Sequence, residues 1–388
     1  MNNNGRSRGM TLAQGFNMKT YNNLYQQVCD LENLKLAHKK ARKGKTLKSY
    51  VVEFEKNLKE NLQIIRTELL FHSYRPLPLK TFILRDPKTR KISVSDFKDR
   101  IVHHAICNII EPIFDNKFIF DSYANRKGKG SLAAIQRFNK FSRKVSHNAT
   151  LVNNSKNIRG FCLKCDIKQY FDSMDHEKLL DIVAKSIKDK KLLFLLRTIL
   201  KNHNSKQQGK GMPLGNLTSQ FLANVYLNEL DQYVKHKLKA KYYIRYVDDF
   251  VILHNNIDML AKYKNQIIEF LNQNLLIQIS ESKTKIQPIS RGVDFLGFKI
   301  FYYHKLLRKR NIRKCFRNIN HLKQRYDEKQ LTYDEVYDYI QGWFAYAKNA
   351  NTHKLRHKIT AIIDSFFIGQ MSMIEIDRWI KTMKEQAM

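Results

Sequence analysis

The segment YYIRYVDDFVIL (residues 242–253) constrains the fold more than any other part of this chain, because two aspartates separate two apolar pieces. Such a pattern predicts a β-hairpin with Asp248 and Asp249 at its tip. Earlier in the chain, the apolar segment GFCLKCD ends on a third aspartate, Asp166. An isolated Asp-Asp pair is usually an ordinary turn, but strands that lie side by side in one sheet would bring all three carboxylates together. The chain is therefore expected to build a sheet with acidic side chains at one end.

The rest of the chain alternates between helical and extended patterns, which places it in the α+β class. A basic hairpin is expected around the turn Asp86-Pro87-Lys88, and residues 217–238 have the pattern of a long amphipathic helix. Residues 1–17 are polar and predict a flexible tip. Further helices are expected over residues 49–72, 100–114, 175–187 and 258–273, a strand pair over 293–303, and a basic helical region from residue 304 onward.

The composition predicts a large folded protein that associates with polyanions. The chain has 388 residues, 43% of them hydrophobic, which is enough for two or three subdomains. Lys and Arg number 70 against 35 Asp and Glu, a formal net charge of +35, so nucleic acid is the expected partner. No apolar run has the length of a membrane span, and the N-terminus lacks the apolar centre of a secretory signal. A cytoplasmic protein without membrane contact is expected.

The five cysteines are odd in number and scattered, so free thiols are expected rather than a disulfide framework. Cys162 and Cys165 form a CxxC pair, yet they fall on an expected strand, where side chains three residues apart point to opposite faces. No second Cys/His pair follows at zinc spacing, so zinc is not expected here.

Aspartates gathered at strand ends suit magnesium, which takes one or two carboxylates together with phosphate oxygens and water. Nucleotidyl transfer uses two such ions, about 3.5–4 Å apart, to activate the attacking oxygen and to neutralise the leaving pyrophosphate. Asp166, Asp248 and Asp249 are therefore the candidate catalytic residues.

The order of the motifs adds a family resemblance. The tetrad Tyr246-Val247-Asp248-Asp249 resembles the YxDD box of bacterial reverse transcriptases, and CDIKQYF resembles their block with the first catalytic aspartate. The other matching blocks are KDRIVHHAICNIIEPIF, DSYANRKGKG, GMPLGNLTSQ, ESKTKI and VDFLGF, in the family's order. The resemblance implies a right-hand polymerase with fingers, a palm whose mainly antiparallel sheet is backed by helices, and a helical thumb. The regions it implies are an N-terminal helical extension with the start of the fingers (1–80), fingers (81–160), palm (161–300) and a basic helical thumb or C-terminal region (301–388).

The resemblance also implies RNA-directed DNA synthesis with two Mg²⁺ ions, for which Mn²⁺ is an alternative. Asp166 and Asp248 would be the principal metal ligands, and Asp249 a third, weaker or indirect one. The backbone carbonyl of Ile167 would be available to the second ion. The expected partners are template RNA, cDNA and dNTPs.

Several residues are implied to bind the incoming dNTP. Phe171 corresponds to the aromatic steric gate that excludes a ribose 2′-hydroxyl, with Tyr170 as the next candidate. Arg90 and Arg126 fall where basic residues contact the triphosphate, and planar guanidinium groups suit phosphate oxygens. Lys283 matches a lysine that approaches the leaving pyrophosphate; Lys285 lies two residues on along an expected strand and competes for that role.

The block GMPLGNLTSQ contributes Leu214, Gly215 and Gln220 to the same dNTP site. Most reverse transcriptases carry glutamine where this chain has Leu214. Leucine offers no directional hydrogen bond to the nucleotide, so low copying fidelity is expected. Two other features are assigned to structure rather than to the site. These are the paired histidines His103 and His104 on an apolar helix, and the aromatic residues around Trp343 and Tyr346, whose helical spacing is typical of a core.

The biological role has more than one interpretation. Group II intron, retron and retroviral enzymes read QGxxxSP where this chain reads LGxxxSQ, which resembles diversity-generating retroelements and related defence-associated (unknown-group) enzymes. Neither an intron-type maturase-plus-endonuclease tail nor an RNase H domain is expected. Copying of a template-repeat RNA with an accessory protein, and DNA synthesis from a dedicated non-coding RNA in anti-phage defence with a second polymerase or effector, both remain open, as do priming and oligomeric state. A catalytically degenerate RNA-binding scaffold of a ribonucleoprotein is a different alternative, which the intact aspartates oppose.

Overall fold

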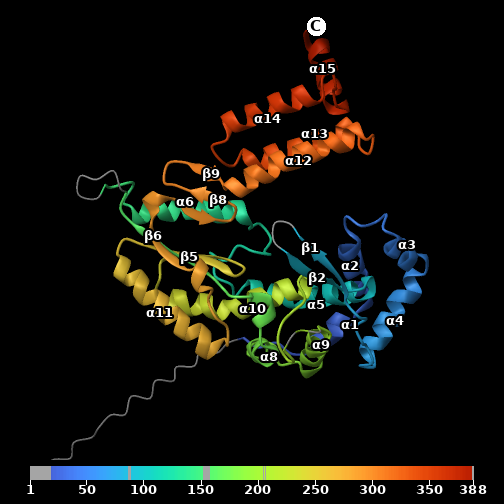
Figure 1. The fold of residues 1–388 in the computed structure, drawn as a ribbon. Coiled ribbons are helices and arrows are strands. Elements are labelled where there is room, and N and C mark those ends of the chain that lie inside the picture. The colour runs from blue at the N-terminus through green and yellow to red at the C-terminus, as the bar shows by residue number, and fades with distance from the viewer. Residues whose placement is uncertain (1–18, 86–88, 152–157, 204, 206, 387–388) are drawn as a thin grey trace, which may run out of the picture. The chain divides into compact units, whose positions relative to one another are not determined.

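The computed structural model describes residues 19–85, 89–151, 158–203, 205 and 207–386 (Figure 1). The chain divides into two compact units. Unit 1 comprises Met1–Phe118, Lys168–Glu229 and Asn272–Ile277, and unit 2 comprises Ile119–Ile167, Leu230–Leu271 and Gln278–Met388. The units cut across the four regions expected from the sequence, whose boundaries stay a prediction. The expected flexible tip at residues 1–17 and the turn Asp86-Pro87-Lys88 lie outside the described residues.

Unit 1 is mostly helical, with one two-stranded sheet. Strands β1 (Lys80–Leu84) and β2 (Arg90–Val94) pair antiparallel with Leu84 opposite Arg90, which confirms the expected hairpin. Its helices are α1 (Leu24–Cys29), α2 (Leu31–Arg42), α3 (Ser49–Lys56), α4 (Leu58–Leu70), α5 (Phe97–Asp115), α7 (Tyr170–Ser173), α8 (His176–Ala184), α9 (Lys190–Lys201) and most of α10 (Leu217–Gln232).

The single helix expected over residues 49–72 is divided into two helices in the structure. The segment 49–72 breaks between α3 and α4 at Asn57, whose backbone leaves the helical region with φ −123° and ψ 49°. The Asn61 side-chain amide donates to the Phe54 carbonyl at 2.9 Å and so satisfies a group that the end of α3 leaves unpaired. The spacing of apolar residues does not reveal such a bond, so the sequence pattern predicts one continuous helix.

Helix α5 carries the paired histidines of the sequence. Burial lowers the pKa of His103 to about 3 and that of His104 to about 4. Both imidazoles are therefore neutral at pH 7, which agrees with a structural role.

Unit 2 contains a four-stranded antiparallel sheet with the order β4-β5-β3-β6. The strands are β4 (Tyr242–Tyr246), β5 (Asp249–His254), β3 (Phe161–Asp166) and β6 (Lys285–Pro288). Helix α6 (Ser131–Val145) covers β4 and β5, and its Phe138 and Phe141 share one core with Ile244 and Val251 (Figure 1). The β4–β5 pairing confirms the hairpin expected from the sequence. Helix α10 runs on into a π-helical turn at Tyr233–Lys237, so the expected long helix over 217–238 is also present.

The C-terminal part of unit 2 adds a small sheet and a helical region. Strands β7 (Val293–Phe295), β8 (Phe298–Ile300) and β9 (Lys305–Leu307) form the antiparallel order β7-β8-β9. The following helices are α12 (Lys309–Asp327), α13 (Tyr333–Ala347), α14 (His353–Phe366) and α15 (Met373–Gln386). Trp343 and Tyr346 of α13 pack against buried apolar residues, as their spacing predicted. Every strand pair of the three sheets is antiparallel, which confirms the α+β class.

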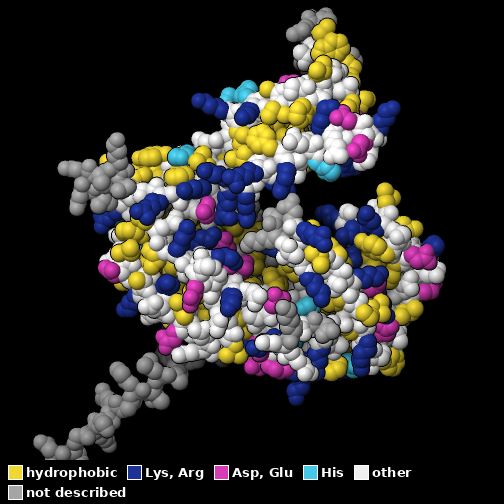
Figure 2. Space-filling view, in the orientation of Figure 1, with side chains coloured by type: hydrophobic (Ala, Val, Ile, Leu, Met, Phe, Trp, Pro, Cys, Tyr) yellow, Lys and Arg dark blue, Asp and Glu magenta, His cyan; other side chains and the backbone are white. Residues whose placement is uncertain are grey.

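The excess of Lys and Arg in the composition is visible on the surface of the protein. Figure 2 shows Lys and Arg side chains gathered where α12 begins, and the exposed basic residues of that helix are Lys309, Arg310, Arg313 and Arg317. All five cysteines are free and buried. Within the described part of the chain, the helices are too short or too polar to cross a membrane.

Candidate active site

Three aspartates lie at one end of the four-stranded sheet in unit 2. Asp166 is the last residue of β3, Asp249 is the first residue of β5, and the two are directly opposite in the register. Opposed residues of antiparallel strands have Cα atoms about 4.5–5.5 Å apart. Asp248 occupies the second position of the two-residue turn that joins β4 to β5. The fold therefore brings together the carboxylates that the sequence singled out.

The turn that carries Asp248 is strained. Tyr246 is paired with Asp249, which leaves Val247 and Asp248 as the two central residues. Val247 has φ 54°, in the left-handed region that a β-branched residue rarely adopts. The Val247 carbonyl accepts from Arg245 Nη1 at 3.1 Å, and the Asp248 carbonyl accepts from the Ile167 N–H at 3.3 Å. Hydrogen bonds thus hold both carbonyls of the turn.

Lysine ammonium groups contact two of the carboxylates. Lys283 Nζ is bonded to Asp166 Oδ1, and Lys164 Nζ lies 3.3 Å from Asp249 Oδ2. Lys283 is not on a strand, contrary to the sequence-based expectation, because residues Glu281–Lys283 form a 3-10 turn and β6 begins at Lys285. The exposed Lys285 is opposite Lys164 in the register. Of the two lysines, Lys283 is therefore the one that contacts Asp166.

Asp249 is the carboxylate whose pKa is shifted by its surroundings. Burial raises its pKa to about 6 against the opposing effect of Lys164, and the neighbouring Asp166 and Asp248 raise it further. Its Oδ1 is buried without a hydrogen-bond partner among the described residues. A bound cation would supply the partner that this buried oxygen lacks.

These features fit a magnesium site. The donor set consists of carboxylate oxygens, which are hard ligands of the kind that Mg²⁺ prefers. Among the residues that the structure describes, no group of three or more His, Cys, Asp and Glu side chains forms a ready metal cage. Magnesium in sites that bind nucleotides needs only one or two carboxylates, with phosphate oxygens and water completing its shell.

The candidate steric gate lies in unit 1, on the short helix α7. Phe171 is half-buried, and its ring centroid lies 5.6 Å from that of Tyr170. Tyr170 is 2% exposed, and its hydroxyl donates to the Ala223 carbonyl at 2.5 Å. Of the two aromatic residues, Phe171 is the one with a face accessible to a ligand.

The block with Leu214 also lies in unit 1 and is bonded to β2. Leu214 is half-buried, and its carbonyl accepts from the Ser93 N–H at 3.0 Å. Gly215 has φ 121°, and a Cβ at this position would lie 3.0 Å from Ile92 Cγ2. The next residue, Asn216, is buried and accepts from the Ser95 N–H at 3.1 Å.

Gln220 lies in the first turn of α10, and its N–H donates to the Asn216 carbonyl at 3.2 Å. Sequence reasoning passed over Asn216, although its position between a glycine and an amphipathic helix is a signal for a capping residue.

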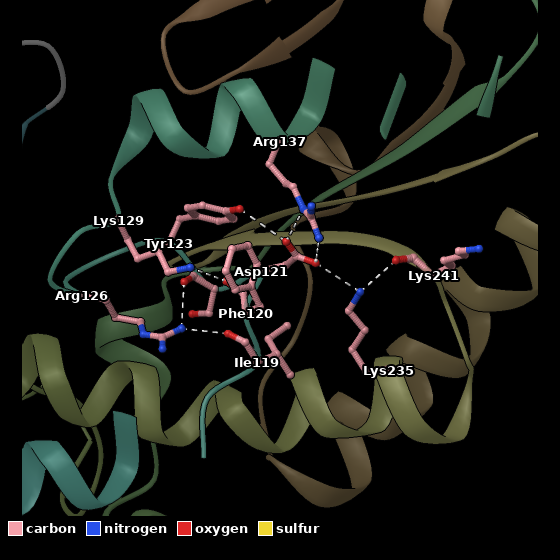
Figure 3. Close-up of polar contacts among 10 residues, drawn as sticks. Ile119, Phe120, Asp121, Tyr123, Arg126, Lys129, Arg137, Lys235 and Lys241 are labelled. Carbon is pink, nitrogen blue, oxygen red and sulfur yellow. Dashed lines mark hydrogen bonds and ion pairs between the residues drawn. The ribbon is translucent and has the colours of Figure 1, made fainter. Parts of the chain in front are cut away.

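The two candidate triphosphate-binding arginines lie in different units. Arg90 is exposed at the start of β2 in unit 1. Arg126 lies in unit 2, where its Nη1 donates to the carbonyls of Ile119 and Ser122 at 2.8 and 3.1 Å (Figure 3). Arg126 thus shapes the loop that carries it, and its role toward a triphosphate stays a prediction.

A buried polar group that sequence reasoning missed lies next to the Val247–Asp248 turn. Asp231 and Arg245 form an ion pair in which both side chains are 0% exposed. A charged residue immediately before the YVDD tetrad, within an otherwise apolar strand, was the available signal.

Comparison with known proteins agrees with the geometry. Residues 84–300 match the family described as reverse transcriptase (RNA-dependent DNA polymerase). Protein YkfC of Escherichia coli K12 is 28% identical over 290 residues, which cover 64% of this chain and 72% of YkfC. The group II intron-encoded protein LtrA of Lactococcus lactis subsp. cremoris is 24% identical over 311 residues, which cover 62% of this chain and 50% of LtrA.

Among solved structures, an apo telomerase from Candida tropicalis truncated from its C-terminal domain matches with a TM-score of 0.43 and 14% identity, covering 62% of this chain and 59% of that chain. The family match takes in β3 and the β4–β5 hairpin, and with them all three aspartates. The chain therefore belongs to the reverse transcriptase (RNA-dependent DNA polymerase) family.

Proposed function

We propose that this protein synthesises cDNA on a cognate RNA template by two-metal nucleotidyl transfer. The observation that carries the proposal is the register of the sheet, which sets Asp166 opposite Asp249 and leaves Asp248 in the adjoining turn. Carboxylates held in this way suit the metal chemistry of the family to which the chain belongs.

Asp166 and Asp248 would hold Mg²⁺, with Asp249 as the third carboxylate and the Ile167 carbonyl available to a second ion. When bound, Mg²⁺ acts as a Lewis acid that activates the primer 3′-hydroxyl and neutralises charge on the leaving pyrophosphate. Lys283 has its ammonium group at Asp166 and would present positive charge and a proton donor to that pyrophosphate.

The remaining candidate residues would select and hold the nucleotide. The Phe171 ring would exclude a 2′-hydroxyl and so favour dNTPs. Arg90 and Arg126 would bind the triphosphate, and Leu214, Gly215 and Gln220 would line the dNTP site.

The template is proposed to bind along basic surfaces that include the start of α12. Four exposed basic side chains there, on one helix, would contact phosphates rather than bases. RNA affinity is accordingly expected to fall steeply as salt rises, because bound phosphates release counterions.

For the biological role, we retain two proposals, both resting on the LGxxxSQ block. One is a diversity-generating retroelement that works with an accessory protein, and the other is an anti-phage system with a second polymerase or effector. A variable-gene repeat beside the gene would support the first, and a defence island the second. Sequencing the RNA and DNA that co-purify with the protein would identify the template and the primer.

The central test is Asp248→Asn, which removes one carboxylate charge with almost no change in size. Primer extension on RNA with Mg²⁺ is expected to fall by at least about a thousandfold, since a lost metal contact costs several kcal/mol in the transition state. Asp338→Asn, at an exposed aspartate of α13, is the matched control and should leave the rate unchanged.

A folded Asp248→Asn protein that extends primers at the parental rate would refute the assignment. A parent that binds RNA but never extends a primer would instead favour the alternative of a ribonucleoprotein scaffold.

A further inference from the structure

The buried ion pair next to the Val247–Asp248 turn is bidentate. Arg245 Nε donates to Asp231 Oδ1 at 2.7 Å, and Arg245 Nη2 donates to Asp231 Oδ2 at 2.6 Å. The Tyr243 hydroxyl donates to the same Oδ1 at 2.7 Å. A guanidinium group is planar, with its donors in a fixed fork. Asp231 therefore sets the plane of the Arg245 head group, and with it the direction of Nη1.

The backbone of Arg245 is anchored as firmly as its head group. Its N–H donates to the Asp121 carbonyl and its carbonyl accepts from the Tyr123 N–H, both at 3.0 Å. Asp121 is in turn held by Arg137 at 2.7 Å and by Lys235 at 3.5 Å (Figure 3). Both ends of the Arg245 side chain are thus fixed before it reaches the turn.

The group that Nη1 reaches is the Val247 carbonyl, at 3.1 Å. Val247 holds φ 54°, a conformation that persists in a β-branched residue only when its surroundings enforce it. The direction of this carbonyl fixes the Val247–Asp248 peptide plane, from which the Asp248 side chain departs. The contact from Arg245 is therefore placed to enforce the strained turn.

A merely structural role for the pair would be filled as well by apolar residues. Replacing a buried ion pair with apolar side chains of similar volume is often neutral or stabilising. Apolar side chains would lack a donor directed at the Val247 carbonyl. Compared with an apolar core, the charged group adds a hydrogen-bond donor that points at the Val247 carbonyl.

We propose that Asp231, Tyr243 and Arg245 are positioning residues that hold the strained Val247–Asp248 peptide and thereby aim the Asp248 carboxylate. The inference rests on the proposed function, because Asp248 matters only if it serves the polymerase reaction. It adds to that function three residues that touch neither metal nor nucleotide.

The test replaces the whole polar group, so that no buried charge is left unpaired. The triple variant Asp231→Leu, Tyr243→Phe, Arg245→Met should melt within a few degrees of the parent. Its kcat should fall at least about tenfold, since misplacing a reacting group by 1 Å can cost about a hundredfold. KM for dNTP should change less than about threefold, because the variant leaves every proposed nucleotide contact intact.

Val247→Gly supplies the discriminating measurement, because glycine adopts positive φ without strain. Its effect on kcat should differ between the two backgrounds, and in the triple variant it should restore a large part of the lost rate. Such coupling is expected only if the polar group acts through the Val247 conformation. Equal effects of Val247→Gly in both backgrounds, or a triple variant with the parental kcat, would overturn the proposal.

Amide hydrogen exchange separates this inference from the proposed function. Peptides that span residues 242–254 should exchange faster in the triple variant, whether or not the protein is a polymerase. An inactive parent would therefore defeat the proposed function, while unchanged exchange would defeat the positioning role. If the triple variant does not fold, Arg245→Lys provides the same comparisons, because one ammonium group cannot hold both Asp231 oxygens and the Val247 carbonyl.

Discussion

The acidic end of the sheet in unit 2 and the 211–220 block in unit 1 are held in place by different means. Asp166 and Asp249 take their positions from strand register, where a slip of one residue would turn each side chain to the opposite face. Leu214 and Gly215 take theirs from a turn that two hydrogen bonds attach to Ser93 of β2 and to Ser95 just after it. In the proposed function, strand register would fix the positions of the metal-binding carboxylates, which tolerate no displacement, while a loop would set nucleotide selectivity, which can be tuned.

The most severe test of this comparison is Asp166→Glu, which keeps the charge but moves the carboxylate outward by one methylene. We expect primer extension to fall at least about a hundredfold, because the register allows the strand no compensating shift. Asp338→Glu on α13 is the matched control, and single-turnover rates with Mg²⁺ are the measurement. A loss smaller than about tenfold would break the comparison, because it would show that the acidic end tolerates displacement.

The second test concerns sugar selection in unit 1. Phe171→Val should lower the preference for dNTP over rNTP by about 10–100-fold, since opening space for one small group is worth about 1–3 kcal/mol. Incorporation of dNTPs should change much less. Competition between the two nucleotides on one RNA template gives the ratio.

Tyr170→Phe is the companion variant for that experiment. It removes the hydroxyl that donates to the Ala223 carbonyl and should lower stability by about 1 kcal/mol without changing the preference. A changed preference in Tyr170→Phe with none in Phe171→Val would move the gate to Tyr170.

The third test examines how the loop is attached. Gly215→Ala places a Cβ 3.0 Å from Ile92 Cγ2 at φ 121° and should lower the free energy of unfolding by about 1–3 kcal/mol. Gly342→Ala, within α13 where a Cβ meets nothing within 4 Å, should instead be neutral or stabilising. Thermal unfolding of both variants checks the contrast, and equal melting temperatures would mean that the β2 attachment constrains less than the geometry indicates.

The smallest expected effect is on fidelity. Leu214→Gln adds an amide that can hydrogen-bond the nucleotide, and a bond of about 1 kcal/mol would lower misincorporation several-fold. Gln220→Pro, which would bring the block closer to QGxxxSP, removes the N–H that bonds the Asn216 carbonyl, so Leu214→Gln is measured alone first. Sequenced products from a defined RNA template decide the matter. If the parent is as accurate as glutamine-bearing relatives, or if the variant makes errors at the parental rate, Leu214 does not determine fidelity.

Much of the fold follows from local patterns in the sequence. The β4–β5 and β1–β2 hairpins, the long helix through α10 and the α+β class were all expected, because period and turn chemistry are local signals. The break at Asn57 was missed, since it depends on a side-chain bond from Asn61 to a backbone carbonyl.

The site divides in the same way. Its aspartates can be recognised in the sequence as acidic residues within apolar segments. The partners of Lys164 and Asp231, by contrast, depend on which elements pack together in the fold. Neither pairing leaves a mark on the spacing of residues. The 3-10 turn at Lys283 is a similar case, because the back-bonds of Thr284 to Ser280 and Glu281 override an extended pattern.

The buried thiols allow the opening of each unit to be followed by its own cysteines. Cys29 and Cys107 belong to unit 1, and Cys162, Cys165 and Cys315 to unit 2. Burial raises the pKa of Cys29 to about 11 and that of Cys315 to about 12, so little reactive thiolate exists near neutral pH while the protein is folded. Alkylation therefore requires opening of the surrounding core. A pulse of thiol reagent followed by peptide mapping would time the opening of the two units separately, in one sample and without an engineered probe.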